Sequence, residues 1–209
     1  MIQLPEIRIV AFDCDGVLFD TAAANRAYYN TILAGIGLPP MTDDQFAYVH
    51  MHTVAASLEF LVGRENLERA QAVRRQAGYG PFIQHMKKVP FLEELLDRLD
   101  GRYHTAIATN RSNTMNRVLN EHGLAGRFEM VVTALDVMRP KPAPEQLLKI
   151  LENFRAAPGQ MVYIGDSELD QAAARSAQVP FIAYNNSRLT ADAHAADMRQ
   201  VQSLLGLGG

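Results

Sequence analysis

Five short apolar runs rich in β-branched residues recur along the chain, and the last four are separated by stretches with helical periodicity. Strands that alternate with short helices are typical of right-handed βαβ units, which build a parallel sheet covered by helices. The sequence therefore predicts an α/β protein with a Rossmann-like parallel core. The expected strands are Arg8–Asp13, His104–Thr109, Glu129–Thr133, Met161–Asp166 and Phe181–Tyr184.

The stretch between the first two expected strands breaks this alternation, because it is far longer than one crossover helix requires. It has mostly helical periodicity, with a turn sequence at residues 61–63. We therefore expect a helical cap domain, residues 19–88, inserted into an α/β core made of residues 1–18 and 89–209. The helices expected in the cap are Thr21–Leu33, Gln45–Phe60, Glu65–Ala77 and Phe82–Met86.

Composition excludes several classes of protein. The 209 residues are 48% hydrophobic and 21% charged, which is ordinary for a soluble globular chain. A net charge of −3 without a long basic run gives no electrostatic footprint for nucleic acid. A single cysteine, Cys14, excludes an internal disulfide, and no segment approaches the roughly 18 apolar residues of a membrane span. With no signal-peptide pattern at the N-terminus, we expect a cytoplasmic protein. The sequence does not predict its oligomeric state.

The first expected strand ends on two acidic residues, Asp13 and Asp15, at the edge where open α/β sheets place their ligands. Two carboxylates this close repel one another unless a cation or a shared proton intervenes, and Gly16 then allows a sharp turn. The arrangement suggests a magnesium site with one carboxylate free to attack, although a lone Asp-x-Asp-Gly is more often a turn former or a helix cap. A calcium loop of the EF-hand type is excluded, because its sixth and twelfth positions would be Leu18 and Ala24 instead of Gly and Glu.

Polar residues also follow the second and third expected strands. Thr109 could donate its hydroxyl to a phosphate oxygen, together with backbone N–H groups near the next helix, although Thr109 and Asn110 would also serve as helix caps. Lys141 lies between Pro140 and Pro142, which stiffen the backbone and can aim the ammonium group inward. A compact cation in that place suits a phosphate and a carboxylate, whereas the alternative is an exposed lysine in a proline-rich turn.

The fourth expected strand ends on Asp166, and Asp170 lies one helical turn further on, so both acids can face the same site. Asp166 and Ser167 would also serve as helix caps. Capping at every one of these strand ends would be a poor joint explanation. The clusters together predict one acidic metal site beside an anion-binding site.

The order Asp-x-Asp-Gly, Thr-Asn, Lys-Pro and Gly-Asp-Ser-x-x-x-Asp resembles the haloacid dehalogenase superfamily. More narrowly it is similar to the phosphoglycolate phosphatase-like branch, whose helical cap follows the first motif, and the resemblance covers the whole chain. It implies that Asp13 attacks phosphorus and forms an aspartyl-phosphate. It also implies that Asp15 protonates the leaving alcohol and then activates water.

The resemblance assigns the remaining motif residues as well. Thr109 and Asn110 would bind the transferring phosphoryl group with backbone amides, and Lys141 would pair with Asp13 and offset charge on the phosphoryl oxygens. Mg²⁺ would be held by Asp13, the backbone carbonyl of Asp15, and Asp166, with waters completing the shell. Asp170 would orient these ligands from behind or join them through water.

The expected activity is magnesium-dependent hydrolysis of a small phosphorylated metabolite, phosphoglycolate or a sugar phosphate. The presence of Asp15 favours phosphate esters over dehalogenation, since a halide needs no proton. Phosphonate cleavage through a cap lysine is disfavoured, because the cap has only Lys87 and Lys88, both at its exit. A phosphosugar mutase of the same fold is the nearest alternative. A phospho-accepting signalling receiver or a non-catalytic binding protein is the alternative from another class.

The cap is expected to select the substrate, since it closes over the phosphate. Arg26, close to the hinge, and His50 and His52 are candidate substrate contacts, with surface or packing roles as the simpler alternative. Arg139 is an additional cation expected at the surface. Gln178 stands where relatives usually carry a glycine, which puts the local helix ending in question.

Overall fold

The computed structural model of the chain describes residues 6–51 and 54–207. Backbone contacts divide the chain into two compact units, one made of residues 1–20 and 88–209 and the other of residues 21–87. We call them the core unit and the helical unit. The strand β2 (Phe19–Asp20) pairs with β3 (Lys87–Lys88) where the chain passes between the two units.

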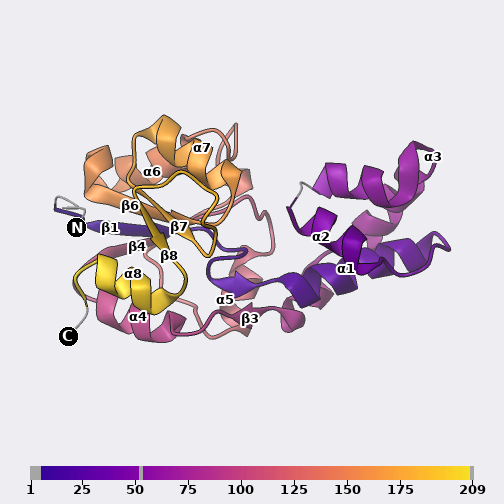
Figure 1. Cartoon of the computed structure of the whole chain (residues 1–209), viewed down its shortest axis with the longest axis horizontal. Coiled ribbons are helices and arrows are strands. Elements are labelled where there is room, and N and C mark those ends of the chain that lie inside the picture. The colour runs from indigo at the N-terminus through magenta and orange to yellow at the C-terminus, as the bar shows by residue number, and fades with distance from the viewer. Residues whose placement is uncertain (1–5, 52–53, 208–209) are drawn as a thin grey trace. The chain divides into compact units, whose positions relative to one another are not determined.

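Within the described residues, six parallel strands form one sheet in the order β5-β4-β1-β6-β7-β8 (Figure 1). The sheet and its flanking helices confirm the predicted Rossmann-like α/β class, and β1, β6 and β7 are buried along their whole length. The short strand β8 was not predicted, because its sequence Ala-His-Ala has no β-branched residue to mark it. The strands are β1 Ile9–Phe12, β4 His104–Ala108, β5 Met130–Val132, β6 Met161–Gly165, β7 Phe181–Tyr184 and β8 Ala193–Ala195.

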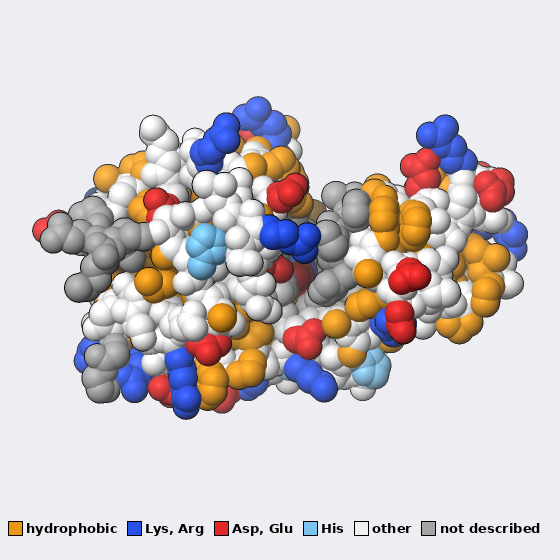
Figure 2. Space-filling model, viewed as in Figure 1, with side chains coloured by type: hydrophobic (Ala, Val, Ile, Leu, Met, Phe, Trp, Pro, Cys, Tyr) orange, Lys and Arg blue, Asp and Glu red, His pale blue; other side chains and the backbone are white. Residues whose placement is uncertain are grey.

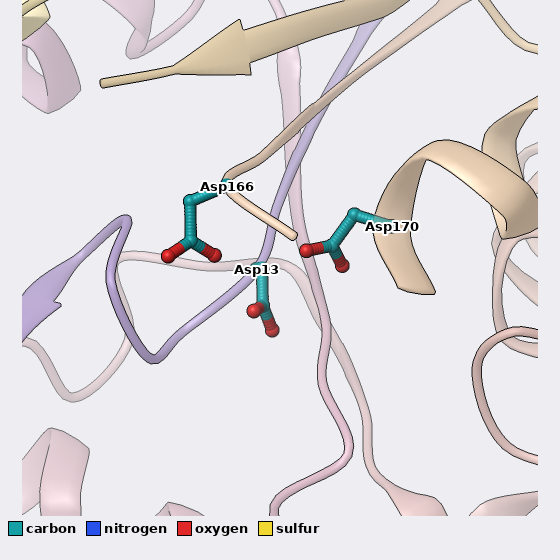
Figure 3. Close-up of side chains that lie close together, drawn as sticks. All are labelled: Asp13, Asp166 and Asp170. Carbon is teal, nitrogen blue, oxygen red and sulfur yellow. The ribbon is translucent and has the colours of Figure 1, made fainter. Parts of the chain in front are cut away.

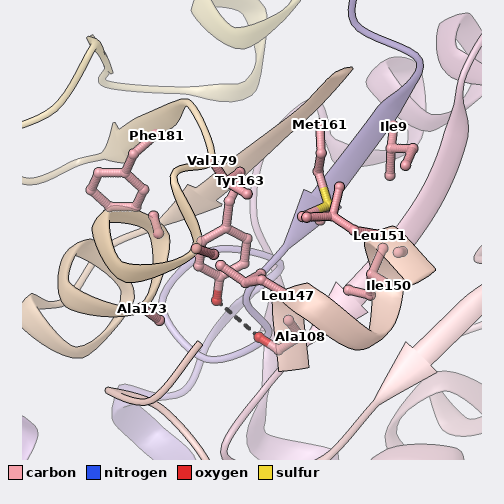
Figure 4. Close-up of a cluster of buried hydrophobic side chains, with 14 of the residues drawn as sticks. Ile9, Ala108, Leu147, Ile150, Leu151, Met161, Tyr163, Ala173, Val179 and Phe181 are labelled. Carbon is pink, nitrogen blue, oxygen red and sulfur yellow. Dashed lines mark hydrogen bonds between the residues drawn. The ribbon is translucent and has the colours of Figure 1, made fainter. Parts of the chain in front are cut away.

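Helices cover both faces of this sheet. Figure 1 shows α6 and α7 on one face and α4 and α8 on the other. Against α6 and α7 lies a fully buried cluster that includes Leu147, Ile150, Tyr163 and Ala173 (Figure 4). The helices of the core unit are α4 Leu92–Leu99, α5 Met115–Glu121, η2 Ala134–Asp136, α6 Glu145–Phe154, η3 Pro158–Gln160, α7 Glu168–Ala177 and α8 Met198–Leu204.

The helical unit contains α1 Ala22–Gly35, α2 Asp43–Met51, α3 Val54–Ala77 and the 3₁₀ segment η1 Gly80–His85. The single helix expected over Gln45–Phe60 is wrong, because α2 ends at Met51 and α3 begins at Val54; residues 52 and 53 lie outside the described part. The turn expected at 61–63 is a kink in α3 at Gly63, whose φ of 70° suits glycine. None of the described helices is long and apolar enough to cross a membrane.

The surface of the core unit carries both signs of charge. Figure 2 shows Lys and Arg side chains interspersed with Asp and Glu over the face that it draws. On this surface α7 ends at Gln178, whose φ of 57° is left-handed, the conformation in which helices usually end on glycine. Because Gln178 is exposed, its side chain meets no packing conflict there. The helix α7 therefore ends in the usual left-handed conformation without a glycine, at a backbone cost of about 1 kcal/mol.

The strand register sets the position of the polar residues. Phe12, the last residue of β1, lies opposite Ile107 of β4 and Ile164 of β6. The residues that follow these three strands therefore leave the sheet side by side at its carboxyl edge. Chemistry-bearing side chains from distant parts of the sequence are brought together at that edge.

Candidate active site

A cluster of acidic side chains lies at the carboxyl edge of the sheet. One carboxylate oxygen each from Asp13, Asp166 and Asp170 lies within 4.8 Å of the other two. Asp13 directly follows β1, Asp166 directly follows β6, and Asp170 stands in the first turn of α7. Figure 3 shows the side chains of the three residues close together. The structure thus brings together acids that the sequence separates widely.

Burial and mutual repulsion raise the pKa of two of these carboxyls. Burial raises the pKa of Asp13 to about 7, with Lys141 opposing the shift and the charges of Asp170 and Asp15 adding to it. Burial also raises the pKa of Asp166 to about 8, together with the charges of Asp13 and Asp170. Two neighbouring carboxyls that hold protons this tightly would release them to a divalent cation, because the cation removes the repulsion.

Lys141 supplies the positive charge in this cluster. Its Nζ lies 2.8 Å from Asp13 Oδ1 and donates hydrogen bonds to Asp170 Oδ1 (2.6 Å) and to the Tyr163 hydroxyl (2.8 Å). Burial alone would lower the pKa of Lys141, but the charges of Asp13 and Asp170 outweigh it and raise the pKa. The ammonium group therefore stays charged, and its N–H groups are directed mainly at protein acceptors.

The backbone of Lys141 is held as firmly as its side chain. Asn110 Nδ2 donates a hydrogen bond to the Lys141 carbonyl at 2.8 Å, and a turn closes beneath it where the Ala143 N–H donates to the Pro140 carbonyl at 3.0 Å. A role for Asn110 in binding the phosphoryl group, which the resemblance implies, stays a prediction. The structure directs its amide to Lys141, so that Asn110 braces the loop carrying the lysine.

Asp170 is fully engaged by protein donors. Oδ1 accepts from Lys141 and from Tyr163 (2.8 Å), and Oδ2 accepts from the backbone N–H and the hydroxyl of Ser167. Burial would raise the pKa of Asp170, but Lys141 and these hydrogen bonds lower it. The side chain also caps α7, since Ser167 and Asp170 form a capping box. Asp170 therefore orients Lys141 and the start of α7.

The carboxylate of Asp166 has a different environment. No other residue in the described part of the chain donates a hydrogen bond to it, although Asn186 Nδ2 holds its backbone carbonyl at 2.8 Å. Gly16, with a φ of 81°, packs so close that a Cβ built there would lie 2.0 Å from Asp166 Oδ2. A close-packed, unpaired carboxylate beside Asp13 fits a hard divalent cation such as Mg²⁺, which prefers oxygen ligands.

Asp15 pairs with a second cationic side chain, Arg111, which was not predicted as a site residue. Arg111 forms an ion pair with Asp15 through Nη2 and Oδ1, and its Nε lies 3.3 Å from Oδ2. The Arg111 side chain is only 7% exposed, whereas that of Asp15 is 39% exposed. The only sequence signal was a cation adjoining the Thr-Asn motif at a strand end.

Thr109 is buried and held on every polar atom of its backbone. Its N–H donates to the Val132 carbonyl (3.0 Å), and its own carbonyl accepts from Gln146 Nε2 (2.7 Å). Its Oγ1 accepts from the Arg111 N–H at 3.1 Å, which leaves the hydroxyl proton available to donate. Because α5 begins only at Met115, amides near Thr109 come from the loop 110–114 and not from the helix start expected from the sequence.

Tyr163 is a further residue that sequence reasoning missed. Its position within an apolar strand indicated a core side chain, and its ring does pack in the buried cluster of Figure 4. Its hydroxyl also lies 2.9 Å from the Ala108 carbonyl, as well as contacting Lys141 and Asp170. The only available signal was a hydroxyl in an otherwise aliphatic strand just before Gly165.

The substrate contacts expected in the helical unit are less defined. Arg26, on α1, pairs with Asp43 of α2 at 2.8 Å, and its guanidinium lies over the Phe46 ring at 4.3 Å. His50 belongs to α2, but its side chain lies outside the described part, as does the whole of His52. These three remain predictions.

Arg139 lies in the core unit and was expected at the surface. Its side chain is 76% exposed and pairs with Glu145, at the start of α6, at 2.6 Å. The backbone N–H groups of Met138 and Arg139 donate to the same carboxylate. Arg139 therefore anchors the loop that leads to Lys141, without lying in the acidic cluster itself.

Comparison with known proteins identifies the family. Residues 10–184 match the haloacid dehalogenase-like hydrolase family, so the chain belongs to this family. It is 28% identical to phosphoglycolate phosphatase of Escherichia coli O157:H7, covering 87% of this chain and 82% of that protein. A crystal structure of a haloacid dehalogenase-superfamily hydrolase, subfamily IA, from Geobacter sulfurreducens PCA is 35% identical with a TM-score of 0.86, covering 97% of each chain.

A further solved structure shares the fold alone. The β-phosphoglucomutase of Clostridium difficile has a TM-score of 0.76 at 19% identity, covering 96% of each chain. The same fold is thus found in a protein named as a mutase and in proteins named as hydrolases. Chemistry must therefore be argued from the site.

Proposed function

We propose that this chain is a magnesium-dependent phosphatase that hydrolyses a small phosphorylated metabolite through an aspartyl-phosphate on Asp13. The observation that carries the proposal is the position of Asp13, held at Oδ1 by the buried Lys141 beside the unpaired carboxylate of Asp166. Membership of the hydrolase family and the likeness to phosphoglycolate phosphatase support a phosphate ester as the substrate. Phosphoglycolate and sugar phosphates are the substrates proposed.

Asp13 acts as the nucleophile in this scheme. One of its oxygens bonds to phosphorus while the bond from phosphorus to the ester oxygen breaks, and Asp15 donates a proton to the departing oxygen. Asp15 then takes a proton from water as that water attacks phosphorus and releases Asp13. Lys141 orients Asp13 throughout and offsets the charge that gathers on it.

The residues present fit a magnesium ion. Asp13, Asp166 and the backbone carbonyl of Asp15 would hold it, and Asp170 would keep Lys141 in place behind them. When bound, Mg²⁺ neutralises charge between these carboxylates and the phosphoryl oxygens. Thr109 would donate its free hydroxyl proton to the phosphoryl group, because its Oγ1 lone pair already accepts from the Arg111 N–H.

Substrate selection is proposed to lie in the helical unit. Arg26 carries a side chain that is 36% exposed and could pair with an acidic leaving group in place of Asp43. His50 and His52 are proposed as further substrate contacts.

The test is phosphate release from para-nitrophenyl phosphate and phosphoglycolate, with and without Mg²⁺, in the wild type and in Asp13→Asn. We expect Mg²⁺-dependent turnover in the wild type and a loss of at least about a thousand-fold in the variant, since an amide is a poor nucleophile. Asp97→Asn is the matched control, because Asp97 is 70% exposed and pairs with Arg127 on the surface. Mass spectrometry after rapid quenching should detect a phosphoryl group on Asp13.

Two results would contradict the proposal. Full turnover in Asp13→Asn would remove Asp13 as the nucleophile. A long-lived aspartyl-phosphate that yields an isomerised sugar phosphate instead of free phosphate would identify a mutase.

A further inference from the structure

We propose that Arg111 is a positioning residue for Asp15, and that it sets the direction in which Asp15 delivers a proton to the leaving group. The proposal rests on the function proposed above, in which Asp15 is the acid. It adds a residue that contacts both Thr109, which would bind the phosphoryl group, and Asp15, which would transfer the proton.

The contact between the two residues fixes the plane of the carboxylate. Arg111 Nη2 contacts Asp15 Oδ1, and Nε lies 3.3 Å from Oδ2, so each oxygen meets a different nitrogen of the planar guanidinium. Within residues 6–51 and 54–207, the hydrogen bonds to the Asp15 carboxylate come from Arg111 alone. The orientation of Asp15 therefore depends on this one side chain.

Burial gives the pair a fixed direction. The Arg111 side chain is 7% exposed and the Asp15 side chain 39% exposed, so the guanidinium lies behind the carboxylate and the carboxylate faces outward. Arg111 Nη1 also donates to Thr114 Oγ1 at 3.2 Å, which anchors the guanidinium from another side. An anchored, mostly buried arginine loses little freedom when it holds a partner, so it can serve as a rigid support.

Arg111 also contacts both of the residues that would act on the two sides of the breaking bond, Thr109 and Asp15. Its backbone N–H donates to Thr109 Oγ1 at 3.1 Å, while its side chain holds Asp15. One residue therefore sets both the hydroxyl that would bind the phosphoryl group and the carboxylate that would protonate the leaving oxygen. A small displacement of Arg111 would change the distance between the two.

The proton transfer is the one given in the proposed function. Asp15 passes a proton from its carboxyl group to the ester oxygen as the bond between that oxygen and phosphorus breaks. The electron pair of the broken bond remains on the ester oxygen, and Asp15 is left as a carboxylate on Arg111. Arginine cannot take part in the transfer itself, because it stays protonated.

The experiment compares leaving groups. The para-nitrophenolate ion departs without a proton, whereas the alkoxide of phosphoglycolate requires one. We expect Arg111→Gln to lower kcat/KM for phosphoglycolate by roughly a hundred-fold and kcat/KM for para-nitrophenyl phosphate by less than about three-fold. Because kcat/KM includes only the steps up to leaving-group departure, the later attack of water does not blur the comparison.

Matched variants separate positioning from structure. Arg111→Lys keeps the charge without the fork and should recover part of the phosphoglycolate activity, and it gives the same comparison where Arg111→Gln does not fold. Arg117→Gln is the control, since Arg117 is 54% exposed and pairs with Glu121 along the surface of α5. It should leave both substrates unchanged.

Each outcome is decisive. Equal losses on the two substrates, or no loss on either, would overturn the positioning role of Arg111. The phosphatase function would still stand if the wild type is active and Asp13→Asn is inactive. A wild type that turns over neither ester would overturn the phosphatase function and this role together.

Discussion

A buried ion pair of the core unit and an exposed ion pair of the helical unit have similar lengths in very different surroundings. In the core unit, Lys141 and Asp170 are 2.6 Å apart, with side chains 2% and 0% exposed. In the helical unit, Arg26 and Asp43 are 2.8 Å apart, with side chains 36% and 95% exposed. Similar distances therefore do not mean similar energies, because water screens the second pair far more than the first.

This difference shows which residues can change independently. Each buried charge of the core unit depends on its partner, since removing one leaves the other unpaired and desolvated. The exposed pair of the helical unit has no such dependence, so its residues can change without loss of the fold. The proposed catalytic residues therefore lie in the core unit and the proposed substrate contacts in the helical unit.

The largest effect is expected where a buried charge is removed. Lys141→Met should lower the free energy of unfolding by about 3–5 kcal/mol, because Asp13 and Asp170 lose their shared cation, and it should abolish turnover. Urea unfolding followed by circular dichroism measures the change. Lys149→Met is the control, since Lys149 is exposed and its Nζ donates to the Asp136 carbonyl at 2.8 Å, and the change should alter stability by less than about 0.5 kcal/mol. If Lys141→Met is as stable as the wild type, the buried ion pairs of Lys141 with Asp13 and Asp170 do not stabilise the fold.

An intermediate effect is expected from pH and Mg²⁺. Asp13 and Asp166 have ordinary pKa values of 3.8, raised in the metal-free fold to about 7 and about 8. Between the ordinary pKa and the raised pKa of each group, the folded protein therefore binds more protons than the unfolded chain. Its free energy of unfolding should fall as pH rises from about 4 through about 8. Because Mg²⁺ competes with these protons, its stabilising effect should grow over the same window.

Thermal unfolding with and without Mg²⁺ at pH 5 and at pH 8 checks this expectation. The increase in Tm on adding Mg²⁺ should be larger at pH 8, and Asp166→Asn should reduce it. An increase of the same size at both pH values, or one that persists in Asp166→Asn, would show that the cation binds elsewhere.

The smallest effect on stability is expected in the helical unit. Arg26→Ala should lower the free energy of unfolding by about 0.5 kcal/mol or less, since the pair with Asp43 is exposed. If Arg26 contacts an acidic leaving group, the KM for phosphoglycolate should rise by about ten-fold while that for para-nitrophenyl phosphate stays constant. Unchanged kcat/KM for phosphoglycolate would remove Arg26 from the proposed substrate site, and Asp43→Asn shows whether the arginine is restrained by its present partner.

Much of the fold could be predicted because strands leave a strong local signal. The run Ile9–Phe12 is apolar and stops at Asp13, and it forms the central strand β1, buried throughout. The helical unit was harder to predict, because one periodic stretch of sequence forms α2 and α3 as separate helices. The strand β8 was missed for the opposite reason, since Ala193–Ala195 is too short and too small to mark itself.

The sequence by itself determined which polar side chains stand at the strand ends, because a buried strand must stop where acidic and basic residues begin. It therefore located Asp13 and Asp166, which directly follow β1 and β6, without a structure. Only the tertiary structure decided how those groups pair. Tyr163 turns its hydroxyl to Lys141, and Arg111 takes hold of Asp15 across 96 positions of sequence. Such pairing depends on the distances between strands that are neighbours in the sheet but far apart in the chain. Local sequence patterns do not specify those distances.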